Sequence, residues 1–306
     1  MNTPARCLLI LCLSVMAFAS ATARSPISLD VLRRDGYGSV DLITSGRNRL
    51  LVPAQINGHK MYLLLDTGCG APGITVSINP SALQITPEKV GHMMVSANGV
   101  RTVVGHGMAK SVVMGNVQIN GAPIFFGRFA GQGYIGRGFL KKNHAVIDLP
   151  NRRLYLRPPG KGRTPNLAVL NSLGMAAAPF SETPSGSFIV HAEVNGVPAE
   201  MALDTGAQIS VLDVRFAKVA GAKGWGRRNV RQIDAAGTMI DADFAGTKTF
   251  KIAGVPIRTP TVFVTRFAGY DYTHGKLAGV LGLDVLGMNW GIIDFAQQKF
   301  YFAGAS

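Results

Sequence analysis

Cysteine is scarce in this chain, with three in 306 residues. Two of them, Cys7 and Cys12, lie in the first 23 residues, so only Cys69 remains in the rest of the chain. A segment with one cysteine forms no internal disulfide, and its stability must therefore come from a packed core. The length and the 47% hydrophobic composition are sufficient for such a core and argue against disorder.

Acidic residues are also few, at 17 against 31 lysines and arginines, which gives a formal charge of +14. The basic residues are scattered along the chain, without a basic helix or an RNA-binding motif, so we predict no nucleic-acid partner. A basic surface favours anionic partners. A simply solvated basic face is the alternative.

Motifs for metal, serine or nucleotide chemistry are missing. The six histidines are dispersed, and neither His-Glu-x-x-His nor Gly-x-Ser-x-Gly occurs. A nominal Gly-x-Gly-x-x-Gly at 131–136 lies where strands are expected, not between a strand and a helix. We therefore predict no metal and no cofactor.

Long apolar runs are absent except near the start, where residues 7–19 form a run of 13 residues. This run is too short to cross a bilayer comfortably. Arg6 precedes it and the small residues of 21–23 (ATA) follow it, as in a secretory signal. We predict a signal peptide at 1–23, a periplasmic or secreted location, and no stable membrane insertion after its removal. An uncleaved membrane anchor is the alternative.

The sequence contains an internal repeat. Residues 50–68 (LLVPAQINGHKMYLLLDTG) align without a gap with residues 188–206 (FIVHAEVNGVPAEMALDTG), at a separation of 138 positions. Each copy has two apolar runs around an Asn-Gly pair and ends in Asp-Thr-Gly. This pattern predicts two strands joined by a tight turn, with the aspartate at the end of the second strand.

A second pair of blocks follows at a separation of 146 positions, namely residues 134–156 and 280–302. The chain therefore reads as two copies of one β-rich unit. We predict a first lobe at 24–158, a linker at 159–179 that is rich in Pro, Gly and Ala, and a second lobe at 180–306.

The repeated residues 64–68 (LLDTG) and 202–206 (ALDTG) resemble the active-site signature of aspartic proteases. Residues 280–286 (VLGLDVL), followed by 292–294 (IID), are similar to the later Gly-centred segment of retroviral proteases. The resemblance is to a single chain with two retroviral-type lobes, as in exported aspartyl proteases of bacteria. It implies an all-β fold of two closed β-barrel lobes related by a pseudo-two-fold axis, with a cleft between them.

The resemblance also implies the chemistry. Asp66 and Asp204 would be the catalytic pair, which shares one proton and activates a water. Gly68 and Gly206 would let the backbone turn past the carboxyl groups. Thr67 and Thr205, as the family implies, would point their hydroxyl groups across the lobe interface. The substrate would be a polypeptide in extended conformation, and a monomer would be sufficient for activity.

Further glycines have supporting roles in this interpretation. We expect Gly136 and Gly282 to pack closely beneath the two active loops. The pairs Asn98-Gly99 and Ala236-Gly237 are candidate flap tips that would cover a bound peptide. Solvent-exposed turns are the alternative for these two tips.

Lobe 1 departs from lobe 2 just after the Asp-Thr-Gly motif. Cys69 stands in place of Ala207, and residues 70–73 (GAPG) stand in place of 208–211 (QISV). The backbone beyond Asp66 must therefore differ from its counterpart. Cys69 is either a small space-filling residue or a site of oxidative control. The predicted function is an aspartic endopeptidase; the alternative is a non-catalytic peptide-binding or regulatory protein of the same fold.

Overall fold

The computed structural model describes most of the chain between residues 27 and 305. The described residues are 27–45, 48–88, 92–95, 101–129, 131–184, 186–224, 230–233, 239–258, 261–266 and 277–305. The predicted signal peptide, residues 1–23, lies outside this part of the chain.

Lobe 1 consists mainly of strands, as the sequence predicts. Its elements are α1 (Val31–Arg34), β1 (Gly38–Asp41), β2 (Ile43–Thr44), β3 (Leu50–Ile56), β4 (His59–Leu65), β5 (Ile74–Val76), the 3-10 helix η1 (Pro80–Leu83), β6 (His92–Val95), β7 (Arg101–Met114), β8 (Val117–Phe126), β9 (Gly133–Ile135), α2 (Arg137–Lys142), β10 (Val146–Asp148) and β11 (Arg153–Leu156).

Lobe 2 is built in the same way. Its elements are α3 (Val169–Ser172), β12 (Ala176–Glu182), β13 (Phe188–Val194), β14 (Val197–Leu203), β15 (Val211–Asp213), α4 (Val214–Val219), β16 (Lys223–Gly224), β17 (Val230–Ile233), β18 (Met239–Gly246), β19 (Phe250–Ile252), β20 (Val255–Pro256), β21 (Val262–Thr265), β22 (Leu277–Leu281), α5 (Leu283–Met288), β23 (Ile292–Asp294) and β24 (Lys299–Phe302). The segment predicted as a linker, 159–179, thus contains α3 and the start of β12.

The predicted Asn-Gly hairpins are confirmed in both lobes. Along β3 the buried side chains alternate with more exposed ones, so that one face packs into the core. Asn57 and Gly58 both have positive φ angles, of 48° and 85°, and Asn195 and Gly196 repeat these values at 50° and 83°. Two successive residues of positive φ form the turn that suits a right-twisted two-residue hairpin.

A six-stranded antiparallel sheet joins the two lobes, in the order β1-β11-β10-β23-β24-β12. At its centre β10 pairs with β23, so that Ile147 lies opposite Ile293. To one side Ile147 faces Leu154, and to the other Ile293 faces Phe300. The two halves of this interlobe sheet therefore have the same register, as the aligned repeats require.

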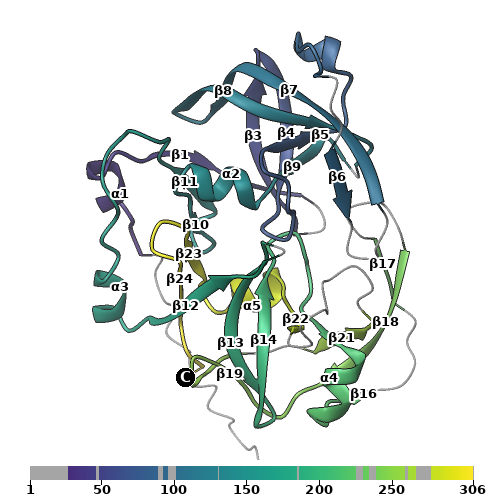
Figure 1. Cartoon of the computed structure of the whole chain (residues 1–306). Coiled ribbons are helices and arrows are strands. Elements are labelled where there is room, and N and C mark those ends of the chain that lie inside the picture. Colours follow the sequence, from purple (N-terminus) through teal and green to yellow (C-terminus); the bar gives the residue numbers. More distant parts are fainter. Residues whose placement is uncertain are drawn as a thin grey trace, which may run out of the picture.

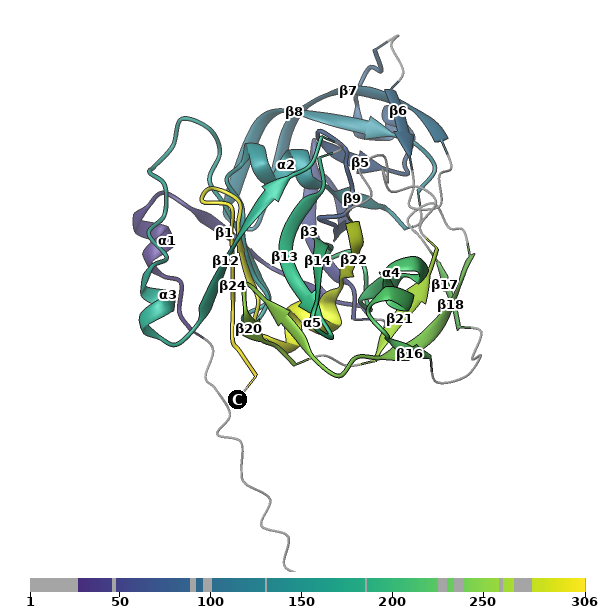
Figure 2. The same ribbon diagram turned by 60° about the horizontal axis from the view of Figure 1, so that its bottom comes forward.

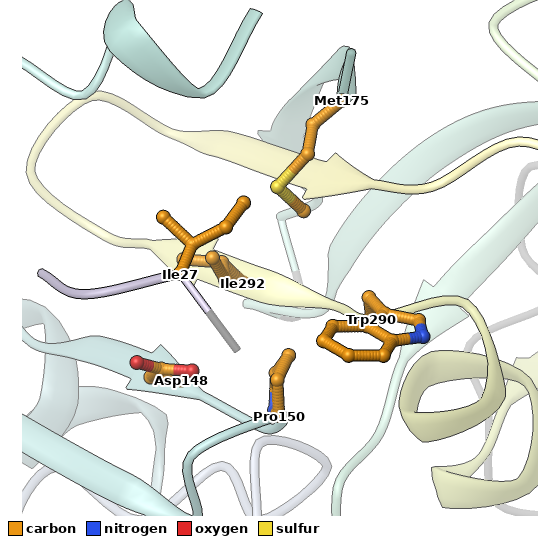
Figure 3. A pocket seen from close by; sticks show the side chains of 6 residues that line it. All are labelled: Ile27, Asp148, Pro150, Met175, Trp290 and Ile292. Carbon is orange, nitrogen blue, oxygen red and sulfur yellow. The ribbon is translucent and has the colours of Figure 1, made fainter. Parts of the chain in front are cut away.

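One face of the interlobe sheet is covered by α1 and α3 (Figures 1 and 2). Leu32 of α1 and Leu170 of α3 are fully buried there against Tyr155 and Tyr301. Figure 3 shows a small pocket at this face, which is lined by Ile27, Asp148, Pro150, Met175, Trp290 and Ile292. The N-terminal residues from 27 onwards are therefore part of the packed fold.

Lobe 1 is a closed six-stranded barrel, in which β3, β4, β9, β5, β8 and β7 pair in turn. The long strand β7 closes the barrel, because it pairs with β8 along its length and then with the end of β3. The interior is apolar and holds fully buried residues such as Val52, Leu63, Ile74 and Ile124. Burial of this apolar surface is the main source of stability for the lobe.

Lobe 2 follows the same strand path but its circuit is interrupted. Two strands, β18 and β19, replace the single β7, and β19 pairs with β13 through Phe250 opposite Val194. The Asn195 side chain accepts hydrogen bonds from the N–H groups of Lys248 and Thr249 in the break between these strands. The prediction of two closed barrels is therefore right for lobe 1, whereas lobe 2 is a second, interrupted sheet.

No helix in the described part of the chain is both long and apolar enough to span a bilayer.

Asp294 lies at the lobe junction, at the end of β23, and is fully buried. Its Oδ1 accepts hydrogen bonds from the N–H groups of Ala296 and Gln297, whereas its buried Oδ2 has no partner among the described residues. Burial raises the pKa of Asp294 to about 6. Because the folded state then binds the proton more tightly than the unfolded chain, folding stability falls as pH rises from about 4 towards 6.

Asp294→Asn keeps Oδ1 and removes the ionisation. Between about pH 4 and 7 we expect the free energy of unfolding to fall by about 3 kcal/mol more in the wild type than in this variant, since one pKa unit corresponds to about 1.4 kcal/mol. Urea unfolding at each pH measures the difference, with the exposed Asp41→Asn as control. Equal pH dependence in the wild type and Asp294→Asn would contradict the assignment.

Candidate active site

The two Asp-Thr-Gly loops follow equivalent strands. Asp66 comes directly after β4, which pairs in parallel with β9, and Asp204 comes directly after β14, which pairs in parallel with β22. The N–H of Asp66 donates to the carbonyl oxygen of Ile135, and that of Asp204 donates to the carbonyl oxygen of Leu281, both at 3.0 Å. Each aspartate is thus fixed at the same point of its lobe.

Reciprocal hydrogen bonds join the two loops. The Thr67 hydroxyl donates to the carbonyl oxygen of Leu203, and the Thr205 hydroxyl donates to that of Leu65, both at 2.8 Å. Each hydroxyl oxygen also accepts the N–H of the other threonine, at 2.9 and 3.1 Å. Both threonines are almost fully buried. The cross-lobe arrangement expected for Thr67 and Thr205 is therefore present in the structure.

This link brings the two carboxyl groups together. A Cβ atom added to Gly68 would lie 2.5 Å from Oδ2 of Asp204, and one added to Gly206 would lie 2.4 Å from Cγ of Asp66. Only glycine leaves room for the opposite carboxyl group at these two positions. The two carboxyl groups are near enough for the charge of Asp204 to raise the pKa of Asp66.

Burial and mutual repulsion favour a shared proton. Burial and the neighbouring Asp204 raise the pKa of Asp66 to about 8, against the hydrogen bonds from the N–H groups of Cys69 and Gly68. Burial also raises the pKa of Asp204, which is opposed by the N–H groups of Gly206 and Ala207. Two adjacent carboxyl groups hold one proton as a unit, so the pair is described by joint titration steps.

The predicted supporting glycines lie beneath the two loops. A Cβ atom on Gly136 would lie 2.7 Å from the carbonyl oxygen of Cys69, and one on Gly282 would lie 2.7 Å from the carbonyl carbon of Ile209. Any side chain here would displace the backbone of an active loop. Both positions therefore require glycine for packing.

The loop after Asp66 is two residues longer than its counterpart. In lobe 1, Val76 pairs with Gly133 and Phe126. In lobe 2, the residue that pairs with the equivalent positions, Gly279 and Val264, is Leu212. Val76 therefore corresponds to Leu212, and the chain from Asp66 to Val76 is two residues longer than the chain from Asp204 to Leu212.

Cys69 does match Ala207, because their carbonyl oxygens accept the equivalent N–H groups of Arg137 and Leu283, but the gapless alignment of residues 70–73 with 208–211 is wrong. A difference in the backbone beyond Asp66 was predicted, and the longer loop is its cause.

The longer loop replaces a polar network. In lobe 2, the Asp284 carboxylate accepts hydrogen bonds from the N–H and the hydroxyl of Ser210, and Ser210 in turn accepts the N–H of Gly282. In lobe 1, Gly138 stands in place of Asp284, and Pro72 of the longer loop occupies the space beside it. Asp284 therefore supports the loop that contains Ser210.

Cys69 is half-buried beside Asp66, and its N–H donates to Oδ1 of Asp66 at 2.9 Å. Burial and the adjacent Asp66 raise the pKa of the Cys69 thiol to about 12. Because the thiolate is the reactive form, a raised pKa makes oxidation slow. The geometry thus favours the space-filling interpretation of Cys69 over oxidative control.

Arg137 is a residue near the site that the sequence analysis missed. It begins α2, directly after Gly136, and its Nη1 donates to the Ser187 hydroxyl of lobe 2 at 2.9 Å. Its positive charge lowers the pKa of Asp204, against the larger effect of burial. The residue of lobe 2 that aligns with Arg137 is Leu283. This difference between the repeats is the feature of the sequence that could have identified Arg137 as a residue of interest.

Other predicted features receive no test from the structure. The candidate flap tips Asn98-Gly99 and Ala236-Gly237 lie outside the described residues. The strands that lead to each tip are described, and in lobe 1 Val95 pairs with Arg101.

In the described part of the chain, no three His, Cys, Asp or Glu side chains lie close enough together to bind a metal ion.

Comparison with known proteins agrees with this geometry. The aspartyl protease family profile matches residues 190–285, which include Asp204 and the start of α5. The fold is that of pepsin- and retropepsin-like aspartic proteases. No curated protein is similar enough in sequence to match this chain.

Solved structures extend the likeness to both lobes of the chain. The aspartic proteinase from Irpex lacteus superimposes with a TM-score of 0.55 at 14% identity, covering 88% of this chain and 98% of the other. Basic 7S globulin from soybean gives a TM-score of 0.50 at 12% identity, covering 89% and 95%. At such low identity these similarities establish the fold alone.

Thr205→Val tests the link between the two Asp-Thr-Gly loops. The substitution leaves the buried carbonyl of Leu65 and the N–H of Thr67 without their partner, so we expect a loss of about 2–4 kcal/mol in the free energy of unfolding. Thr205→Ser keeps the hydroxyl and is the matched control. Urea unfolding compares the two, and a valine variant as stable as the serine variant would refute the role of these hydrogen bonds.

Proposed function

We propose that the chain is an aspartic endopeptidase that hydrolyses extended polypeptides with a water activated between Asp66 and Asp204. The observation that supports this most strongly is that each carboxyl group lies against the glycine of the opposite Asp-Thr-Gly loop, which brings the two side chains close together. The family and the fold already indicate a protease. The assignment of this pair as the reacting groups is the step that we propose.

In the proposed reaction the ionised member of the pair takes a proton from the water as it attacks the scissile carbonyl carbon. The protonated member donates to the carbonyl oxygen, and a proton then passes to the leaving amine. The N–H groups that point at Asp66 and Asp204 hold both carboxyl groups in place throughout. No covalent intermediate with the protein is required.

Both halves of the site come from one chain, which supports a catalytic monomer. The interlobe sheet and the threonine hydrogen bonds supply the contact that two separate subunits would otherwise have to make. We further propose that residues 1–23 direct export and that the protease acts on polypeptides in the periplasm or outside the cell.

A non-catalytic peptide-binding protein is the second candidate. A neighbour in fold, basic 7S globulin from soybean, is named as a globulin, so the fold is not confined to proteins named as proteases. The longer loop after Asp66 also distinguishes lobe 1 from lobe 2. Retention of both aspartates, in contact, supports the enzyme over this alternative.

Asp66→Asn and Asp204→Asn test the proposal. Each substitution removes the carboxyl group that must gain or lose a proton, so we expect hydrolysis of a fluorophore-labelled unfolded protein to fall about 10²- to 10⁴-fold. Asp41→Asn, at the exposed end of β1, is the control and should retain activity. Hydrolysis that persists in both active-site variants would exclude the pair, and binding without hydrolysis in the wild type would support the second candidate.

The pH profile of kcat/KM tests the effect of Arg137. Activity requires one proton on the pair, so it should fall at high pH as that proton is lost. Because the Arg137 cation favours the ionised form of Asp204, Arg137→Leu should move the alkaline limb to higher pH, whereas Arg137→Lys should leave it nearly in place. Identical alkaline limbs in the leucine and lysine variants would show that the charge does not act on the pair.

A further inference from the structure

The first described segment of the chain, residues 27–42, belongs to the internal repeat. At the separation of 138 positions, residues 27–42 (ISLDVLRRDGYGSVDL) align without a gap with residues 165–180 (PNLAVLNSLGMAAAPF). The identical residues are Leu29, Val31, Leu32 and Gly36, which recur as Leu167, Val169, Leu170 and Gly174. So few identities carry little weight alone, and the comparison of the two segments depends on their structures.

The two segments begin with the same short helix. α1 and α3 occupy equivalent positions of the repeat. The N–H of Leu32 donates to the carbonyl oxygen of Leu29, and the N–H of Leu170 donates to that of Leu167, both at 2.9 Å. A glycine of positive φ follows each helix, with 85° at 36 and 78° at 174. The backbone of one segment is therefore a copy of the other.

The strands and anchors of the two segments also correspond. Gly38 of β1 pairs with Leu156 of β11, and Ala176 of β12 pairs with Phe302 of β24. At the start of the first segment, Asn151 Nδ2 donates to the carbonyl oxygen of Ile27 at 2.8 Å. The equivalent residue Gln297 donates through Nε2 to the carbonyl oxygen of Pro165. Residues 27–42 are thus the opening part of the first repeat, as residues 165–180 are of the second.

Residues 27–42 fasten several parts of the molecule together. Leu29, Leu32 and Tyr37 are at most 4% exposed. They pack in one apolar cluster with side chains of α3, and Figures 1 and 2 show α1 and α3 side by side. Asp35 binds the chain between the lobes, because its carbonyl oxygen accepts the N–H of Arg163 and its carboxylate pairs with the Arg163 side chain. The segment therefore contacts both repeats and the connection between them.

The reacting pair is held by other parts of the chain. In the described residues, the hydrogen bonds to the Asp66 and Asp204 carboxyl groups come from N–H groups of the active loops themselves. The segment 27–42 lies instead on the face of the interlobe sheet that carries Tyr155 and Tyr301. A pro-segment that keeps a protease inactive must block the cleft or displace the reacting groups, and its removal releases that constraint. The contacts of residues 27–42 are of a different kind.

We propose that residues 27–42 are a permanent clasp between the two lobes and that the protease is active without their removal. The counterpart of this segment, residues 165–180, lies in the middle of the chain and has the same packing. Loss of residues 27–42 would remove the edge strand β1 from the interlobe sheet and expose the apolar cluster beneath α1. The statement about activity rests on the proposed function, whereas the statement about the clasp does not.

A cut made after folding tests the clasp without reference to activity. A recognition sequence for a site-specific protease is inserted after Asn48, an exposed residue before β3, and the uncut variant is the control. After cleavage we expect the N-terminal fragment to co-elute with the rest of the chain in gel filtration. If it is released, the Tm of the remainder should fall by at least about 10 °C, because buried apolar surface becomes exposed. Release of the fragment with an unchanged Tm of the remainder would overturn the proposal.

Point variants compare the two copies of the segment. Leu32→Ala and Leu170→Ala remove equivalent side chains that are fully buried, so each should lower the Tm by at least about 5 °C. Val169→Ala, at a position of α3 that is 49% exposed, is the matched control and should change the Tm by less than about 2 °C. A Leu32→Ala variant as stable as Val169→Ala would contradict the clasp.

The activity of the purified protein is followed together with the mass of the intact chain. We expect hydrolysis of a labelled unfolded protein from the first time point, by a species whose chain still contains residues 27–42. A lag, with activity that rises in step with cleavage between residues 28 and 49, would refute the inference. Absence of hydrolysis at any time would contradict the proposed function, and the cut chain would still decide whether the segment is a clasp.

Discussion

The contact between the two Asp-Thr-Gly loops is the constraint on which the rest of the structure depends. Thr67 and Thr205 each bond to the backbone of the other lobe, and the glycines that follow leave just enough room for the opposite carboxyl group. The interlobe sheet fixes the lobes in the register that this contact needs. Two carboxyl groups are held close together, Asp66 being buried, and this favours a shared proton over two ionised groups.

Much of this could be predicted from the sequence because the chain is repeated. The Asn-Gly turns at 57 and 195 locate the hairpins, and their spacing places Asp66 and Asp204 at equivalent strand ends. Repetition of a motif in the same context is a far stronger signal than the motif alone. The glycines at 136 and 282 were found in the same way, since each must pass closely under its loop.

The unpredicted features are those in which the repeats differ. The two additional residues after Asp66 lie in a short stretch that contains Gly and Pro. An insertion in such a stretch interrupts no strand or helix pattern, so it is not visible when the two repeats are aligned. Arg137 reaches Ser187 across the lobe interface, and a contact between distant segments leaves no local pattern.

The central claim is that Asp66 and Asp204 hold one proton between them near neutral pH, and carbon-13 NMR of the carboxyl groups of labelled aspartate tests it most directly. The account predicts that this pair retains one proton well above pH 4, with both Cγ signals responding to the same titration step, and that Asp204→Asn abolishes the coupling. Independent titration of both carboxyl groups near pH 4 would contradict the account.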